Sequence, residues 1–180
     1  RFQPIFRQRL GRLTRSLGAP MIEYKAPWSS SLKWISWVTT GVLSAGAIFL
    51  VIIKLYFVAP LLLLVLAGAA PFSIRGYVIE RDSLVVRRLF WNTTLPLSDL
   101  QSAEFNPEAM KRSWRTAGNG GLYSFCGYFS NKVLGDYRAL VTNPDLSVVL
   151  RFPSEIVVVS PDSPAIFVQK ILDRSEAPNP

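Results

Sequence analysis

One long apolar stretch limits what this chain can fold into. Residues 41–72, GVLSAGAIFLVIIKLYFVAPLLLLVLAGAAPF, contain a single charged side chain, Lys54. The hydrocarbon core of a bilayer is about 30 Å thick, so a helix needs roughly 20 residues to cross it. The uncharged runs 35–53 and 55–72 contain 19 and 18 residues, so one continuous helix would be far too long for a single span. We therefore expect a transmembrane helical hairpin over residues 34–72, with Lys54 at its turn.

Two other interpretations of this stretch fit less well. A buried hairpin of a soluble helical protein is also apolar, but buried helices rarely run so far without charge. A cleaved signal peptide is shorter, begins closer to the start of a chain, and is not followed by a second span.

Positive charge flanks the apolar stretch on both sides. Lys25 and Lys33 precede it, Arg75 and three further arginines follow it, and the turn offers only Lys54. Because lysine and arginine accumulate in cytoplasmic flanks, we expect both termini in the cytoplasm and Trp34 at the cytoplasmic interface. The predicted location is an inner membrane or an internal photosynthetic membrane, with the lipid bilayer as a partner.

The basic charge is concentrated in the N-terminal part of the chain. Residues 1–72 carry eight Lys and Arg and one acid, whereas residues 73–180 carry twelve bases and eleven acids, so +7 of the net +8 precedes residue 73. Such a distribution is typical of membrane orientation and argues against nucleic acid as a partner of the folded domain.

Residues 1–33 are expected to form a basic arm followed by a linker. RFQPIFRQRLGRLTRSLG has a broad apolar helical stripe, and we expect the arginines of this amphipathic helix to lie at the membrane surface: Arg7, Arg9, Arg12 and Arg15. Pairing with lipid phosphates and packing on a protein are equally compatible with this pattern. The following stretch, MIEYKAPWSSSLKW, is interpreted as a linker.

From residue 73 the pattern changes to short β-like runs. We expect about seven strands. Two of them flank a hairpin turn at Asn143, Pro144 and Asp145, and the other five lie at residues 76–80, 84–91, 102–105, 122–129 and 155–160. Between them we expect a short helical turn at 98–100, a helical or irregular excursion at 107–113, and a loop at GNGG, residues 118–121. The last element is an amphipathic helix that begins at Pro164, with Phe167, Val168, Ile171 and Leu172 in one apolar stripe. A disordered tail is expected over residues 175–180.

Several of these segments resemble a known family. SWRTAGNGGLYSFCGYF, YRALVTNPDLSVVLRF and IVVVSPDSPAIFVQKIL are similar to the bacterial PH-domain families, and GYVIERDSLVVRRLFWNTTLPLSDL after an apolar hairpin resembles their membrane-anchored members. The resemblance covers roughly residues 34–174 and rests mainly on VTNPDLSVVL and VSPDSPAIF. It implies a pleckstrin-homology-like (PH-like) β-roll over residues 73–174 on the cytoplasmic side, and no particular activity. The expected fold is therefore an α+β membrane protein with an N-terminal amphipathic helix, a two-helix transmembrane hairpin and this β-roll with its C-terminal helix.

Lipid-binding PH domains carry a basic cluster around their first strand pair. The corresponding turn here, residues 80–83, holds two acids and one base, and Arg87 and Arg88 cannot share one face of a strand. This departure argues against headgroup recognition there, and we interpret both arginines as solvated residues at the sheet edge.

The chain offers few groups for catalysis or metal binding. It has no histidine and a single cysteine, Cys126, so an intrachain disulfide and the commonest general base are excluded. We predict a non-enzymatic protein without metal, cofactor or catalytic residues, which serves as an accessory, scaffold or assembly subunit of a larger membrane complex. Aromatic residues near the glycine-rich loop are either core residues or partner contacts, and the candidates for contact are Trp114, Asn119, Tyr123 and Tyr128. The alternative function is the binding of anionic lipid through the N-terminal arm.

Overall fold

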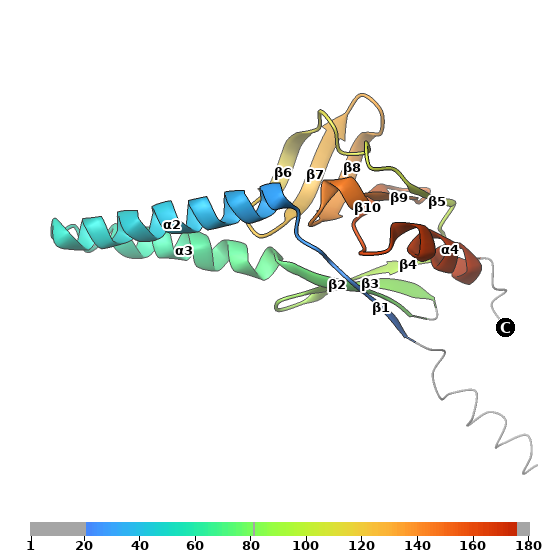
Figure 1. The fold of residues 1–180 in the computed structure, drawn as a ribbon, viewed down its shortest axis with the longest axis horizontal. Coiled ribbons are helices and arrows are strands. Elements are labelled where there is room, and N and C mark those ends of the chain that lie inside the picture. The colour runs from blue at the N-terminus through green and yellow to red at the C-terminus, as the bar shows by residue number, and fades with distance from the viewer. Residues whose placement is uncertain (1–20, 81, 176–180) are drawn as a thin grey trace, which may run out of the picture.

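The computed structural model describes residues 21–80 and 82–175. Two β-sheets and a C-terminal helix form one domain, and a pair of helices projects from one side of it (Figure 1). The basic arm and the four arginines predicted on it lie outside the described residues.

The first sheet is antiparallel and has four strands in the order β1-β2-β3-β4. Its strands are β1 (Ile22–Lys25), β2 (Ile74–Ile79), β3 (Ser83–Arg88) and β4 (Asn92–Pro96). The interpretation of residues 21–34 as a linker was wrong, because β1 lies there and pairs with β2 along its whole length. Tyr24 anchors this strand on the domain, because its ring is buried and packs edge-to-face on the Phe167 ring, with 5.0 Å between the ring centroids.

The second sheet has six strands in the order β5-β9-β10-β8-β7-β6. Its strands are β5 (Ser102–Phe105), β6 (Trp114–Gly120), β7 (Phe125–Asn131), β8 (Gly135–Val141), β9 (Val148–Arg151) and β10 (Ile156–Val159). The predicted hairpin around Asn143 was wrong, because β10 lies between β8 and β9 and runs parallel to β8. Val157, Val158 and Val159 of β10 are fully buried. A continuous apolar run of this kind suits a central strand that is covered on both faces.

Other sequence-based expectations about the domain need smaller corrections. The described residues form ten strands rather than about seven, because β1, β4 and β6 were not expected. Gly118 and Gly120 of the predicted loop belong to β6, which pairs with β7. Residues 98–99 form a hydrogen-bonded turn rather than a helix. Residues 107–112 form turns, which agrees with the irregular excursion that was one of the two expectations for this segment.

The C-terminal helix was predicted correctly. α4 (Pro164–Ser175) begins at the expected proline, and its Phe167 and Ile171 are fully buried. Both side chains belong to the core cluster between the two sheets, with Tyr77 of β2 and Leu140 of β8. α4 lies on the side of the domain opposite to the projecting helices (Figure 1).

The projecting helices are α2 (Ser30–Ile52) and α3 (Ala59–Ala69), and α3 continues into the 3₁₀ turn η1 (Ala70–Phe72). They lie side by side, and a Cβ added at Gly46 of α2 would be 3.4 Å from the Leu62 side chain of α3. The turn between them contains Lys54, as predicted, with a φ of 63°. α2 is the one helix of the described part that is long and apolar enough to cross a membrane, while the helical run Ala59–Phe72 is shorter.

A buried polar network joins the two sheets and the start of α2. The Tyr77 hydroxyl donates to the Leu140 carbonyl at 2.7 Å and accepts from the Ser160 amide at 3.1 Å. The Ser160 hydroxyl in turn accepts from the Thr142 amide, and the Thr142 carbonyl accepts from the Ser29 amide. Ser29 caps α2 by accepting from the Leu32 amide at 3.1 Å, so the helix is tied directly to the core of the domain.

Tyr77 predicts a specific sensitivity to alkaline pH. Burial raises the pKa of Tyr77 to about 12, although hydrogen bonds from Ser160 and Thr142 oppose the shift. Between pH 10 and 12 the unfolded chain releases this proton first, so the free energy of unfolding should fall by roughly 1.4 kcal/mol per pH unit. Below pH 10 the tyrosine is neutral in both states and contributes no pH dependence. Denaturant unfolding of the detergent-solubilised protein at pH 8 and pH 11 measures the difference.

The Tyr77→Phe variant is the control for this effect. It should lose about 1–3 kcal/mol at neutral pH, because the Leu140 carbonyl and the Ser160 amide lose a buried partner. Its stability should then fall less between pH 8 and pH 11 than that of the wild type. The remaining fall comes in part from Tyr24 and Tyr137, whose pKa values burial also raises. An equal alkaline loss in both proteins would contradict the assignment to Tyr77.

Candidate membrane-contact site

The surface of the α2–α3 hairpin is almost entirely apolar and exposed. Phe57 at its tip is 93% exposed, and Trp34 and Trp37 near its base are 72% and 76% exposed. The exposed apolar side chains on the faces of the two helices include Val38, Val42, Ile48, Phe49, Val51, Ile52, Leu61, Leu63, Leu64 and Val65. A continuous apolar surface of this extent marks a contact with lipid or with another apolar surface.

The turn between β6 and β7 binds the base of α2. The Ser36 hydroxyl, which is buried, accepts from the Tyr123 amide at 3.0 Å, and the Tyr123 hydroxyl lies 3.1 Å from the Thr40 hydroxyl. Tyr123 adopts a φ of 66°, and its ring lies 6.3 Å from that of Trp28. Tyr123, a predicted partner contact, is therefore occupied by contacts within the chain.

Asn119 has a structural role in the same turn. Its side-chain amide donates to the Leu122 carbonyl, and its carbonyl oxygen accepts from the Leu122 amide at 3.1 Å. These bonds fix the turn that carries Tyr123, so Asn119 also serves the contact with α2.

The second helix of the hairpin is fixed where it returns to the domain. The buried Ser124 hydroxyl donates to the Phe72 carbonyl at 2.8 Å. The Phe72 ring packs edge-to-face on Trp91, at 5.4 Å between ring centroids. The hairpin is thus held at both of its ends, which sets its direction relative to the two sheets.

The turn between β3 and β4 lies at the foot of the hairpin and was not expected to contribute (Figure 1). Phe90 at this turn is 74% exposed, and Trp91 is 42% exposed. The predicted strand over residues 84–91 includes both aromatic residues, whereas β3 ends at Arg88 and leaves them in the turn.

The two arginines at the end of β3 point to opposite faces of the sheet, as predicted. Arg87 faces outward and pairs with Glu23 at 3.1 Å. The interpretation of Arg88 as a solvated residue was wrong, because it is only 8% exposed. Its guanidinium lies 5.7 Å from the Trp91 ring centroid, and its buried Nε has no hydrogen-bond partner among the described residues.

The remaining candidate residues are distributed over the surface. Arg75 is exposed in a bulge of β2 at the foot of the hairpin, and Lys54 is exposed at its far end. Trp114 of β6 and Tyr128 of β7 are 54% and 55% exposed, so both remain available to a partner. Trp114 borders a hollow of about 550 Å³ whose rim also includes Lys111, Arg112 and Lys132.

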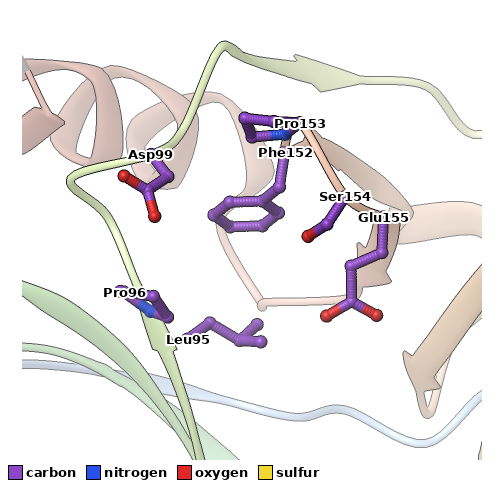
Figure 2. Close-up of a pocket in the computed structure, with 7 residues that line it drawn as sticks. All are labelled: Leu95, Pro96, Asp99, Phe152, Pro153, Ser154 and Glu155. Carbon is purple, nitrogen blue, oxygen red and sulfur yellow. The ribbon is translucent and has the colours of Figure 1, made fainter.

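A second, smaller hollow of about 270 Å³ lies between the end of β4 and the turn from β9 to β10. Figure 2 shows the Phe152 ring at its centre, with the carboxylates of Asp99 and Glu155 on either side. Glu155 is already engaged by Arg138 at 3.8 Å. Within residues 21–80 and 82–175, no three Cys, Asp or Glu side chains form a group suited to a metal ion.

Comparison with known proteins defines the domain. Residues 75–175, more than half of the chain, match the family model described as a bacterial PH domain. The chain belongs to the bacterial PH-domain family. No curated protein and no solved structure matches it significantly.

The matched segment contains the strands from β2 onward and the C-terminal helix. The matched segment begins in β2 and ends with α4, so it contains both turns that hold the helical hairpin. β1, α2 and α3 precede the matched segment.

Proposed function

We propose that this protein is a non-enzymatic, membrane-anchored bacterial PH-domain protein. It serves as an accessory, scaffold or assembly subunit of a larger membrane complex and acts through protein–protein contacts. The observation that supports this most is the exposed apolar hairpin, which is held at both ends by hydrogen bonds at Ser36 and Ser124. A rigid connection of this kind presents the domain to partners at one height and in one orientation.

A two-span hairpin follows from the connectivity if α2 crosses the membrane. Lys25, which precedes α2, pairs with Gly76, which follows α3, so the chain leaves and re-enters the domain at one place. α2 has 23 residues and a length of about 34 Å, enough for one crossing. The return path then consists of residues 53–73, in which α3 and η1 supply the helix and the turn around Lys54 supplies the rest. In this arrangement both termini are cytoplasmic and Lys54 reaches the far headgroups.

The exposed aromatic residues of the domain are the partner contacts in this proposal. Trp114 and Tyr128 are each more than half exposed, and no aromatic pair within the described residues involves either ring. Large aromatic side chains are typical anchors of protein interfaces. With Tyr123 and Asn119 occupied at the base of α2, these two residues are the candidates that remain.

Co-purification tests the proposed role as a complex subunit. The tagged protein is isolated in a gentle detergent, with and without residues 1–18, and partners are identified by mass spectrometry. We expect a stoichiometric set of membrane proteins, which Trp114→Ala and Tyr128→Ala together reduce at least tenfold. The matched control is Ile166→Ala, which truncates an exposed apolar residue of α4 and should leave the set unchanged. Recovery of the wild-type protein alone from native membranes would contradict the proposal.

A further inference from the structure

We infer that the turn between β3 and β4 is a binding site for the phosphate of an anionic lipid. In this site the Arg88 guanidinium binds the phosphate and the Phe90 ring enters the adjoining acyl region. The inference rests on the proposed membrane anchoring and adds a second lipid contact that lies within the domain.

Arg88 is a buried charge without a carboxylate partner among the described residues. It continues the inward-facing series of Leu84 and Val86, and it is 8% exposed. Arg88 makes no ion pair with any carboxylate of the described residues, and its Nε has no acceptor. The Trp91 ring at 5.7 Å stabilises the positive charge but accepts no hydrogen bond in the plane of the guanidinium.

A guanidinium in this state suits a phosphate particularly well. Its N–H groups form a planar fork that binds two phosphate oxygens at once, and a buried cation without an anion is unfavourable. Arg75 lies in the bulge beside the Ile74–Arg88 pair and is exposed, so a second cation is available at the same end of the sheet.

The position of the turn identifies lipid as the source of the phosphate. The contact between Trp91 and Phe72, at 5.4 Å, places the turn beside the last residue of the helical hairpin. If the hairpin spans the bilayer, this level corresponds to the headgroups. Phe90 is 74% exposed there, and an aromatic ring at this depth is stabilised by the interface.

This site differs from the place where lipid-binding PH domains carry their basic cluster. The turn between β2 and β3, with Glu80 and Asp82, lies at the opposite end of β3 from Arg88. The acidic character of that turn therefore does not bear on the site at Arg88.

Lipid titration of the full chain tests the inference. The detergent-solubilised protein is titrated with short-chain phosphatidylglycerol, and binding is followed by native mass spectrometry. We expect Arg88→Gln to weaken binding by about 10- to 100-fold, because it removes a charged, bidentate contact. The matched control Arg87→Gln changes the outward-facing neighbour, which pairs with Glu23, and should alter binding less than twofold.

Two further experiments separate the possible outcomes. Inorganic phosphate at millimolar concentration should not displace the lipid, and displacement would show a site for free phosphate instead. Phe90→Ser changes an exposed side chain and should weaken binding about tenfold without lowering the melting temperature. Equal lipid binding by wild type, Arg88→Gln and Phe90→Ser would overturn the inference. Because carbonate extraction reports membrane insertion separately, that result would leave the proposed anchoring intact.

Discussion

The double variant Val42→Arg, Leu63→Arg is expected to lose stable membrane association. Val42 lies near the middle of α2 and is 65% exposed, and Leu63 lies within α3 and is 51% exposed. An arginine at the centre of a membrane helix costs about 2.5–3.5 kcal/mol on insertion scales, so two of them cost about 5–7 kcal/mol. Most of the variant should therefore appear in the supernatant after alkaline carbonate extraction or be degraded, whereas the wild type stays in the pellet.

The domain offers a matched control for this experiment. Val133 is 75% exposed in the turn between β7 and β8, far along β7 from the hairpin, so Val133→Arg makes the same chemical change outside the proposed membrane segment. This variant should remain in the pellet. If both variants behave like the wild type, the hairpin is not a membrane anchor and its apolar surface belongs to a protein interface.

Replacing Gly127 by Ala is expected to destabilise the domain by about 3–5 kcal/mol. Gly127 of β7 lies opposite Gly118 of β6, and the two backbones approach closely. A Cβ at Gly127 would lie 2.2 Å from the Ala117 carbonyl oxygen, and its φ of 143° is unfavourable for any L side chain. Because backbone atoms cannot move aside as side chains do, the ladder between β6 and β7 must open. Denaturant unfolding of the solubilised protein measures the loss.

Gly68→Ala is the control for this substitution. Gly68 lies in α3, and a Cβ there would have no atom within 4 Å. Alanine is the better helix former by about 1 kcal/mol, so this variant should be as stable as the wild type or slightly more stable. A loss of less than 1 kcal/mol in Gly127→Ala would show that the two strands separate without strain.

The elements that were predicted correctly are those with strong local patterns. α4 combines a proline at its start with an apolar stripe, and its two inward residues, Phe167 and Ile171, are fully buried. The apolar run over residues 41–72, interrupted by Lys54, predicted two helices with that lysine between them, and the structure has this arrangement. The family was also recognised correctly from the sequence, and the match over residues 75–175 confirms it.

The elements that were missed depend on contacts between distant parts of the chain. β1 has only four residues and is a strand because it pairs with β2, about 50 positions later in the chain. β10 separates β8 from β9 although the chain joins those two directly, and no local pattern records such an insertion.

The candidate site shows the same limit. Tyr123 and Asn119 lie in a stretch that has the composition of an exposed loop. Only the fold brings Tyr123 onto Ser36 and Thr40 of α2, and Asn119 onto Leu122 in the turn that carries it. Arg88 is one of two adjacent arginines, and the sequence predicted that they point to opposite faces. Which of the two is buried depended on how the sheets stack, so it required the structure.

We propose that the hairpin crosses the membrane and holds the domain on one side of it. The most direct test is the labelling of single cysteines from a defined side. The native Cys126 is buried, so Lys54→Cys at the hairpin tip and Lys132→Cys in the turn from β7 to β8 provide distinct sites. In sealed vesicles of known orientation, a membrane-impermeant maleimide should label one variant from outside and the other only after permeabilisation. Labelling of both variants from the same side would contradict a membrane-spanning hairpin.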